Sequence, residues 1–473
     1  MSLTRALAMP GLLLWTLWLL PVTAQPPALP EGLGTLKSES RNKSDAPALP
    51  EGLDDDLGET DSERSRTDSA TILPGDLTGF WDTRAGVRLR DDPHQRDTAL
   101  AETRLQLSYQ QTTGRATFRI TGDLIHDDVA DSQRIRFERG QGWFDLREAF
   151  VDTRLGENLD LRAGRQILTW GVGDLVFLND LFPKDWNSFF VGRDVEYLKA
   201  PSDAFRLSGY TPFANVDLVY TPRFDADRFL DNQRLSFFDP LANDIIGGNV
   251  TLDPARPNDW FDDDEWALRI YRTIKSWEVA VYGYHGFWKS PRGFDPVAGR
   301  PTFPRLRSWG ASVRGRVHTG IFSAETAWYD SMDDSKGTDP LVPNSQVRLL
   351  IAYEQELVRN LTLGLQYYLE RTLDRDELKS TLPVSLPEPD RNRHLLTSRL
   401  TLLTHSQTVT WSLFGFMSPS DEDLYIRGLW SWKYTDAWTI EAGFNWFDGR
   451  DDHTFFGQAE TNSNAYVGIR YGF

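Results

Sequence analysis

The chain ends in the stretch Ala465-Tyr466-Val467-Gly468-Ile469-Arg470-Tyr471-Gly472-Phe473, and this stretch decides the fold class. Successive side chains of a β-strand point to opposite faces. Every odd-numbered position here is apolar or aromatic, whereas the even-numbered positions include two glycines and the charged Arg470. The stretch therefore predicts a strand with one apolar and one polar face, and the aromatic Phe473 closes the apolar face.

The same two-residue period recurs upstream. Residues 440–446 alternate Ile, Ala, Phe and Trp with Glu, Gly and Asn, and residues 81–89 alternate Trp, Thr, Ala, Val and Leu with Asp, Arg and Gly. Further strand segments of about ten residues are expected near 100–110, 115–125, 145–155, 158–169, 203–210, 215–222, 265–273, 277–287, 306–317, 320–330, 345–356, 360–370, 393–404, 408–416 and 423–434. Together they make about 18 strands, and an even number is typical of single-chain bacterial barrels.

The connections between these strands alternate between short and long. The short ones are 111–114, 156–158, 211–213, 275–276, 318–320, 359–360, 406–407 and 436–437. Short periplasmic turns and long outer loops are typical of outer-membrane barrels, whose lipid-facing side chains are apolar. The sequence thus predicts an all-β fold over residues 77–473: a transmembrane antiparallel β-barrel of about 18 strands in the outer membrane of a Gram-negative bacterium.

The first residues predict export. Arg5 precedes a short apolar core, and Val22-Thr23-Ala24 gives the small-x-small pattern that signal peptidase reads. We expect residues 1–24 to be a signal peptide cleaved before Gln25. The alternative is an uncleaved anchor, which the short apolar core disfavours.

A tail rich in Pro, Ser and acidic residues follows, over residues 25–76. Its composition cannot bury enough apolar surface to offset the entropy of ordering, so we expect disorder in the periplasm. The unit Pro-Ala-Leu-Pro-Glu-Gly-Leu occurs twice, at 27–33 and 47–53. Two interpretations of the repeat are equally favoured. One is a docking motif for a periplasmic partner, with Leu29 and Leu33 as anchors, and the other is a duplication in a free linker.

Composition excludes several functions. The chain has no cysteine, which excludes a lipoprotein anchor, disulfides and metal–thiolate chemistry. The formal net charge of −18 argues against a nucleic-acid partner. None of the seven histidines stands in a metal-ligand spacing, and no Gly-x-Ser-x-Gly elbow is present. We therefore expect no enzyme, metal or cofactor, although a barrel enzyme could assemble its site from distant strands.

The expected partners belong to the membrane. Outer-membrane lipid and lipopolysaccharide would surround the barrel. The terminal Phe473 resembles the signature that the bacterial barrel assembly machinery reads.

Strand parity predicts which charged side chains face the lumen, because an arginine on the lipid face near the midplane costs about 2–4 kcal/mol. The predicted pore-lining arginines are Arg84, Arg88, Arg104, Arg119, Arg162, Arg206, Arg269, Arg314, Arg348, Arg399, Arg427 and Arg470. The predicted pore-lining acids include Glu102, Glu325, Glu370 and Glu441. Arginines outnumber acids in this set, so the lumen is expected to lean positive and to prefer anions. The alternative is that the charges pair across strands and brace the barrel.

One connection, residues 170–200, is too apolar for a loop in water. Its predicted key residues are Trp170, Asp174, Phe182, Trp186, Phe189 and Phe190. We expect the loop to fold into the barrel as a constriction. The alternative is a loop that packs across the mouth without gating anything.

Residues 161–166 (Leu-Arg-Ala-Gly-Arg-Gln) followed by Trp170-Gly171 resemble a strand of alginate-export-type and related uncharacterised porins. The resemblance implies a barrel of about 18 strands with an arginine-rich lumen. Arg165 departs from strict parity, which would place it on the lipid side and predicts a bulge or the end of the membrane-spanning part. The motif is too short to imply a substrate.

The sequence predicts an outer-membrane channel for diffusion or export of small or polymeric solutes, anionic ones included. The alternative is a non-conducting outer-membrane component whose tail docks an export system and whose barrel accepts lipid or hydrophobic cargo.

Overall fold

The computed structural model describes residues 75–130, 134–248, 250, 252–383 and 386–473. The predicted signal peptide and both copies of the repeated unit lie outside the described residues. Within them, no helix is both long and apolar enough to cross a bilayer.

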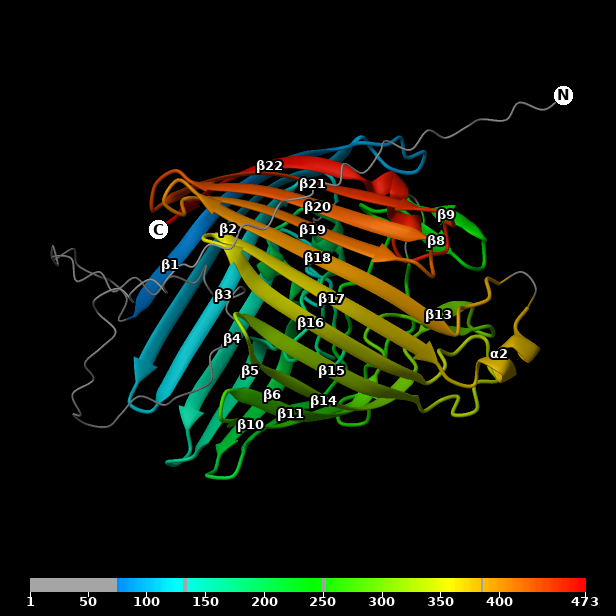
Figure 1. The fold of residues 1–473 in the computed structure, drawn as a ribbon, viewed down its shortest axis with the longest axis horizontal. Helices are drawn as coiled ribbons and strands as arrows, with labels where there is room; N and C mark the ends of the chain where they lie inside the picture. The colour runs from blue at the N-terminus through cyan, green and yellow to red at the C-terminus, as the bar shows by residue number, and fades with distance from the viewer. Residues whose placement is uncertain (1–74, 131–133, 249, 251, 384–385) are drawn as a thin grey trace, which may run out of the picture. The chain divides into compact units, whose positions relative to one another are not determined.

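Eighteen antiparallel strands form one closed ring (Figure 1). Each strand pairs with its neighbour along the chain, and β22 pairs with β1 to close the ring. The strands of the ring are β1 (Asp76–Arg88), β2 (Thr98–Thr113), β3 (Ala116–Asp127), β4 (Phe144–Arg154), β5 (Leu159–Ile167), β6 (Pro201–Tyr210), β7 (Asn215–Thr221), β10 (Glu265–Ile274), β11 (Trp277–Phe287), β14 (Arg305–Val317), β15 (Gly320–Ser331), β16 (Gln346–Val358), β17 (Leu361–Thr372), β18 (Asn392–Thr404), β19 (Val409–Ser418), β20 (Asp423–Lys433), β21 (Trp438–Gly449) and β22 (Asn464–Gly472). The predicted fold class and strand number are confirmed.

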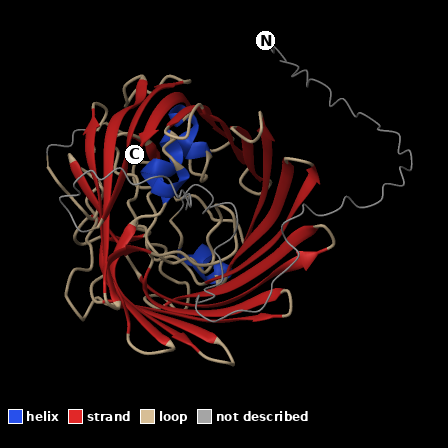
Figure 2. Cartoon of the chain, turned by 90° about the vertical axis from the view of Figure 1, so that its left-hand side faces the viewer, coloured by secondary structure: helices blue, strands red, loops and turns tan. Residues whose placement is uncertain are grey.

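The long connections contain the remaining elements. Two small hairpins are β8 (Phe237–Asp239) with β9 (Asp244–Ile246), and β12 (Gly293–Asp295) with β13 (Arg300–Thr302). The helices are α1 (Trp186–Val191), η1 (Val195–Leu198), α2 (Arg375–Thr381) and η2 (Gly457–Asn462). In a view along the ring, loops and short helices appear within its outline (Figure 2).

The two faces of the wall differ as the alternation predicts. Ile120, Leu365 and Val467 are 55%, 50% and 59% exposed on the outer face. On the inner face, Asp82 and Arg104 are buried and stand opposite each other on neighbouring strands. Charge is therefore collected inside the ring, and the apolar surface faces outward.

The short connections occupy one end of the ring. Lys275, His318 and Asn360 close three of the turns with φ of 58°, 52° and 65°. Tight turns require this left-handed conformation, and two-residue turns between strands commonly place one or both central residues there. All the long connections therefore gather at the opposite end, called here the long-loop end.

Candidate pore constriction

Residues 168–200, called here the inner segment, connect β5 to β6 and contain α1 and η1. The Asp185 carboxylate accepts a hydrogen bond from the Ser188 backbone N–H at 3.0 Å and starts α1, which ends at Gly192 with φ 77°. The Asp194 carboxylate accepts from the Glu196 N–H at 3.2 Å and starts η1. Helices this short are not stable alone, so packing must hold them.

One side of the inner segment is bound to β15. The buried carboxylate of Glu325 accepts from the backbone N–H groups of Val172 and Asn179, at 2.9 and 2.8 Å, and from the Asn179 side chain at 2.8 Å. The Tyr329 hydroxyl donates to the Leu178 carbonyl at 2.5 Å. One carboxylate thus satisfies two backbone N–H groups of an irregular segment, which would otherwise be buried without partners, and one side-chain amide.

Neighbouring strands add to this attachment. The Gln366 side chain of β17 exchanges two hydrogen bonds of 2.8 Å with the backbone of Asp174. Arg399 of β18 donates to the Asp174 carboxylate at 2.8 Å.

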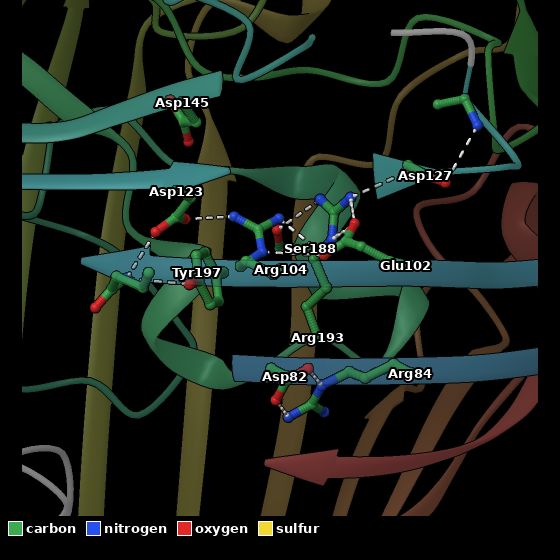
Figure 3. A network of polar contacts seen from close by, with 12 residues as sticks. Asp82, Arg84, Glu102, Arg104, Asp123, Asp127, Asp145, Ser188, Arg193 and Tyr197 are labelled. Carbon is green, nitrogen blue, oxygen red and sulfur yellow. Dashed lines mark hydrogen bonds and ion pairs between the residues drawn. The ribbon is translucent and has the colours of Figure 1, made fainter. Parts of the chain in front are cut away.

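The other side of the inner segment is bound to β2 and β22. Arg193 donates to Glu102 at 2.5 Å and to the Ser188 hydroxyl at 3.2 Å (Figure 3). Asp194 forms an ion pair with Arg470 at 2.9 Å. The ring of Tyr197 lies 4.2 Å from the Arg104 guanidinium, and its hydroxyl accepts from Gln106 at 3.1 Å.

These two attachments lie on opposite walls. In a ring of 18 strands, β15 follows β2 by nine places, because β8, β9, β12 and β13 lie outside the ring. A segment that binds Glu102 on β2 and Glu325 on β15 therefore crosses the lumen.

Aromatic packing holds α1 against a third part of the wall. The Phe189 ring lies 5.4 Å from the Tyr425 ring on β20, and the Phe190 ring lies 5.3 Å from the Phe447 ring on β21. The Trp186 ring lies 6.0 Å from the Phe455 ring. Edge-on and tilted pairs of this kind stabilise a fold by about 0.5–1.5 kcal/mol each beyond area burial.

The structure brings the six predicted segment residues together inside the ring, at separate contacts. Asp174 binds β17 and β18, whereas Trp186, Phe189 and Phe190 pack in the aromatic cluster just described. The Trp170 and Phe182 rings contact each other at 4.8 Å beside Tyr282 of β11.

Ten of the twelve predicted pore-lining arginines have a carboxylate within 4.0 Å. The pairs are Arg84 with Asp82 and Glu441, Arg88 with Asp92, Arg104 with Glu102 and Asp123, Arg119 with Glu148, Arg162 with Asp152, Arg206 with Asp217, Arg269 with Glu278, Arg348 with Glu370, Arg399 with Asp174, and Arg470 with Asp82, Asp194 and Glu196. Arg314 and Arg427 have none among the described residues. Arg427 instead donates to the Arg193 carbonyl at 3.3 Å.

The prediction that the lumen leans positive stays a prediction. It omitted Asp123, Glu148, Asp152 and Asp217, which pair with arginines of the list. Parity could have found Asp123, which shares a face with Arg119. The wall is a network of ion pairs, as the bracing alternative proposed.

The arginines differ in their access to solvent. Arg84 and Arg104 are nearly fully buried at the inner segment, whereas the side chains of Arg119, Arg162 and Arg206 are 35%, 30% and 33% exposed. Near the short turns β2–β3 and β4–β5 lies an open cavity of about 580 Å³, lined by Thr112, Gly114, Arg115, Thr117, Asp152, Arg154, Gly156, Glu157 and Asp160. The part of the wall toward the short turns is thus open and charged.

Arg165, the departure from parity, is 9% exposed. Its guanidinium donates to the Asp203 carboxylate at 3.0 Å and to the carbonyls of Leu146 and Phe137 at 2.7 and 3.0 Å. Arg165 lies two residues before the end of β5, and the preceding residue, Gly164, has φ 123°. The residue is therefore on the outer side by parity and is covered at the long-loop end.

Two acids of the inner segment share Arg470. Burial, followed by the neighbouring Asp194, raises the pKa of Glu196 to about 7. Burial also acts to raise the pKa of Asp194, but Arg470 and Arg84 outweigh it and hold that pKa below its ordinary value. Glu196 is thus half protonated at neutral pH while Asp194 stays ionised.

The closed antiparallel ring, its apolar outer face and its charged interior define an outer-membrane β-barrel. Among the described residues, no group of three His, Cys, Asp or Glu side chains is arranged to hold a metal ion.

No protein-family model matches the chain, and neither does any curated protein. Among solved structures, OccAB4 of Acinetobacter baumannii is similar over 85% of this chain and 98% of its own, with 10% identity and a TM-score of 0.49. OccD3 (OpdP) of Pseudomonas aeruginosa covers 84% and 91%, with 10% identity and a TM-score of 0.47. Wzi, an outer membrane protein of Escherichia coli involved in group 1 capsule assembly, covers 85% of both chains, with 11% identity and a TM-score of 0.46. These comparisons do not show the alginate-export-type family, so that resemblance stays a prediction.

Proposed function

We propose that the chain is an outer-membrane channel for the diffusion of small polar solutes, and that the inner segment restricts its lumen. The observation that carries the proposal is the attachment of one segment to Glu102 and Glu325 on opposite walls. A segment held in this way narrows any path along the barrel axis.

The wall chemistry supports polar solutes. Exposed arginines and their paired carboxylates keep water in the lumen and offer hydrogen bonds of both kinds to a solute. Because most arginines are paired, we propose weak ion selectivity and no strong preference for anions.

The same attachments favour one alternative. A barrel whose inner segment never leaves either wall conducts little, and it would then act as a membrane component that docks a periplasmic system through its N-terminal tail. The tail lies outside the described residues, so this alternative depends on the absence of a current.

Swelling of liposomes that contain the purified full chain tests the proposal. We expect uptake of small sugars that falls steeply with sugar size, and deletion of residues 175–190 should remove this size limit. A milder variant, Arg193→Gln, tests the same attachment without removing the segment. Wild-type and variant barrels that are all impermeable would contradict the channel and support the docking alternative.

A further inference from the structure

The wall is not hydrogen-bonded evenly. The ladder between β4 and β5 stops at Ala149 opposite Arg165, although β4 continues to Phe144 and there pairs only with β3. Residues 144–148 therefore have no strand partner on the β5 side. We call this break the first seam.

A second seam lies on the other flank of the same hairpin. The ladder between β6 and β7 stops at Phe205 opposite Tyr220, although β6 begins at Pro201. Between the seams, β5 and β6 pair with each other up to Ile167 opposite Pro201. The two strand ends thus form a narrow panel, residues 165–167 and 201–204, which leads directly into the inner segment.

Side chains close both seams. At the first, Arg165 donates to the Leu146 and Phe137 carbonyls. At the second, Asp225 accepts from the Asp203 N–H at 2.8 Å and from the Ser202 hydroxyl at 3.0 Å. Side-chain bonds replace a backbone ladder here, so the panel can separate from its neighbours without breaking strand pairing elsewhere.

The backbone at the base of the panel requires glycine. Gly164 has φ 123°, and an added Cβ would lie 2.3 Å from the Ala149 carbonyl oxygen. This conformation is open to glycine and strained for other residues, which suits a point about which the panel turns.

The first seam has a charged inner side. A β-bulge in β4 leaves Arg147 without a partner on β3, between the pairs Gly122–Leu146 and Thr121–Glu148. Arg147 is 3% exposed and donates to the Lys199 carbonyl at 2.9 Å, while its Nη1 is buried with no hydrogen-bond partner. A buried cation with an unused donor favours an anionic ligand.

The outer side of the same seam is aromatic. Phe137 is 41% exposed, and its ring lies 6.0 Å from the Phe144 ring. Phe144 pairs with the exposed Leu124, so it shares the lipid-facing side of the wall.

We infer that the panel is a lateral gate between the lumen and the outer leaflet, and that the first seam binds an amphiphile with one anionic group and an apolar chain. The anionic group meets Arg147 and the chain lies against Phe137 and Phe144. This function goes beyond axial diffusion of polar solutes and needs no axial current.

A photoreactive dodecanoic acid, with a diazirine beside its carboxylate, tests the inference on the full chain in phosphatidylcholine nanodiscs. We expect labelling of peptides that contain Phe137 on the outer side and of peptides that contain Arg147 or Tyr197 on the inner side. Arg147→Gln should reduce inner labelling about tenfold, the loss expected for one charge-assisted hydrogen bond. A neutral dodecanol probe should label the outer peptides alone.

A reversible lock separates passage through the seam from adhesion to the surface. Because the chain has no cysteine, Ser202→Cys with Asp225→Cys can form a single disulfide across the second seam. Oxidation should abolish inner labelling, preserve outer labelling and be reversed by a reductant. The control is Thr83→Cys with Thr103→Cys, whose side chains touch at 3.1 Å within a complete ladder.

Three results would overturn the lateral gate: labelling confined to the outer peptides, inner labelling unchanged by the lock, or equal labelling by the neutral probe. If the barrel passes sugars but shows any of these results, the proposed channel function stands and the lateral gate is contradicted. If the barrel does not pass sugars but is labelled as expected, the channel function is contradicted and the lateral gate stands.

Discussion

Glu102 and Glu325 stand on strands nine places apart in the ring, yet both carboxylates hold the same inner segment. Glu102 receives Arg193, and Glu325 receives the backbone and side chain of Asn179. The lumen is therefore crossed by a structure that depends on charge at both ends. Each end can be altered separately by a substitution that keeps side-chain volume.

Removing Asp145 should destabilise the barrel strongly. Asp145 is 1% exposed and binds the buried Arg228 at 2.7 and 2.8 Å. Asp145→Ala leaves that guanidinium without its main partner, a loss of about 3–5 kcal/mol for a broken buried pair. Urea unfolding in detergent micelles, followed by tryptophan fluorescence, measures the change. Asp128→Ala is the control, because Asp128 pairs with His126 on the surface, with side chains 73% and 79% exposed. A loss below 1 kcal/mol for Asp145→Ala would contradict the pairing.

Conductance should rise with pH between about 4.5 and 7. Glu196 takes up a proton when the inner segment docks, because its pKa is about 7 when docked and has the ordinary value of 4.5 when released. Docking is thus strongest below pH 4.5, weakens as pH rises to 7 and stays constant above it. Current recorded across this range in a planar bilayer measures the effect.

Glu196→Gln provides the control for this titration. The variant should lose the rise between pH 4.5 and 7 and keep the low-pH current throughout. Neighbouring Asp194, Asp123, Arg147 and Arg470 also face Glu196. The pKa of Asp194 is held below its ordinary value, so this carboxylate stays ionised in this window. An unchanged pH profile in the variant would assign the effect to another group.

Neutralising the carboxylates that pair with two partly exposed arginines should make the channel anion-selective. Glu148 and Asp152 pair with Arg119 and Arg162 at 3.1 and 2.8 Å. In the double variant Glu148→Gln with Asp152→Asn, two partly exposed guanidiniums lose their counter-charges, so the reversal potential should move toward anions. Arg314→Gln should move it toward cations. No shift in either variant would mean that permeating ions do not meet this wall.

A charged side chain introduced on the outer face should destabilise the barrel. Ile120 is 55% exposed on β3, and arginine there should cost about 2–4 kcal/mol if it faces the bilayer core. Thr117→Arg, which places the same side chain at the open cavity near the short turns, should cost less than about 1 kcal/mol. Folding efficiency into lipid vesicles compares the two variants. Equal losses would contradict the assignment of the two faces.

The ring could be predicted because its signal is local. In a strand such as β22, alternate residues face lipid and the lumen, and their side chains differ accordingly. Arg470 and Val467 could therefore be assigned to opposite faces from the alternation alone. The apolar character of residues 170–200 likewise predicted that they do not lie in water. Neither inference needs knowledge of which strands are neighbours.

The balance of charge in the lumen is harder to predict from the sequence than the strands are. The bulge at Arg147 reverses parity within β4, so Asp145 and Asp152 both face inward although their numbers differ by an odd count. The seams depend on where ladders stop, which is decided by the long connections that fill the space. The binding of Asn179 by Glu325 joins residues 146 positions apart, and no local pattern encodes it.

Single-channel current through the full chain tests the central claim most directly. In Glu325→Gln, one carboxylate oxygen that accepts backbone N–H groups becomes a donor, so the inner segment should leave β15 and the conductance should rise above that of the wild type. Glu354→Gln, a neutralised carboxylate on the neighbouring β16, should leave the conductance as it was. Equal conductance in all three proteins would contradict the account, because the inner segment would then not restrict the lumen.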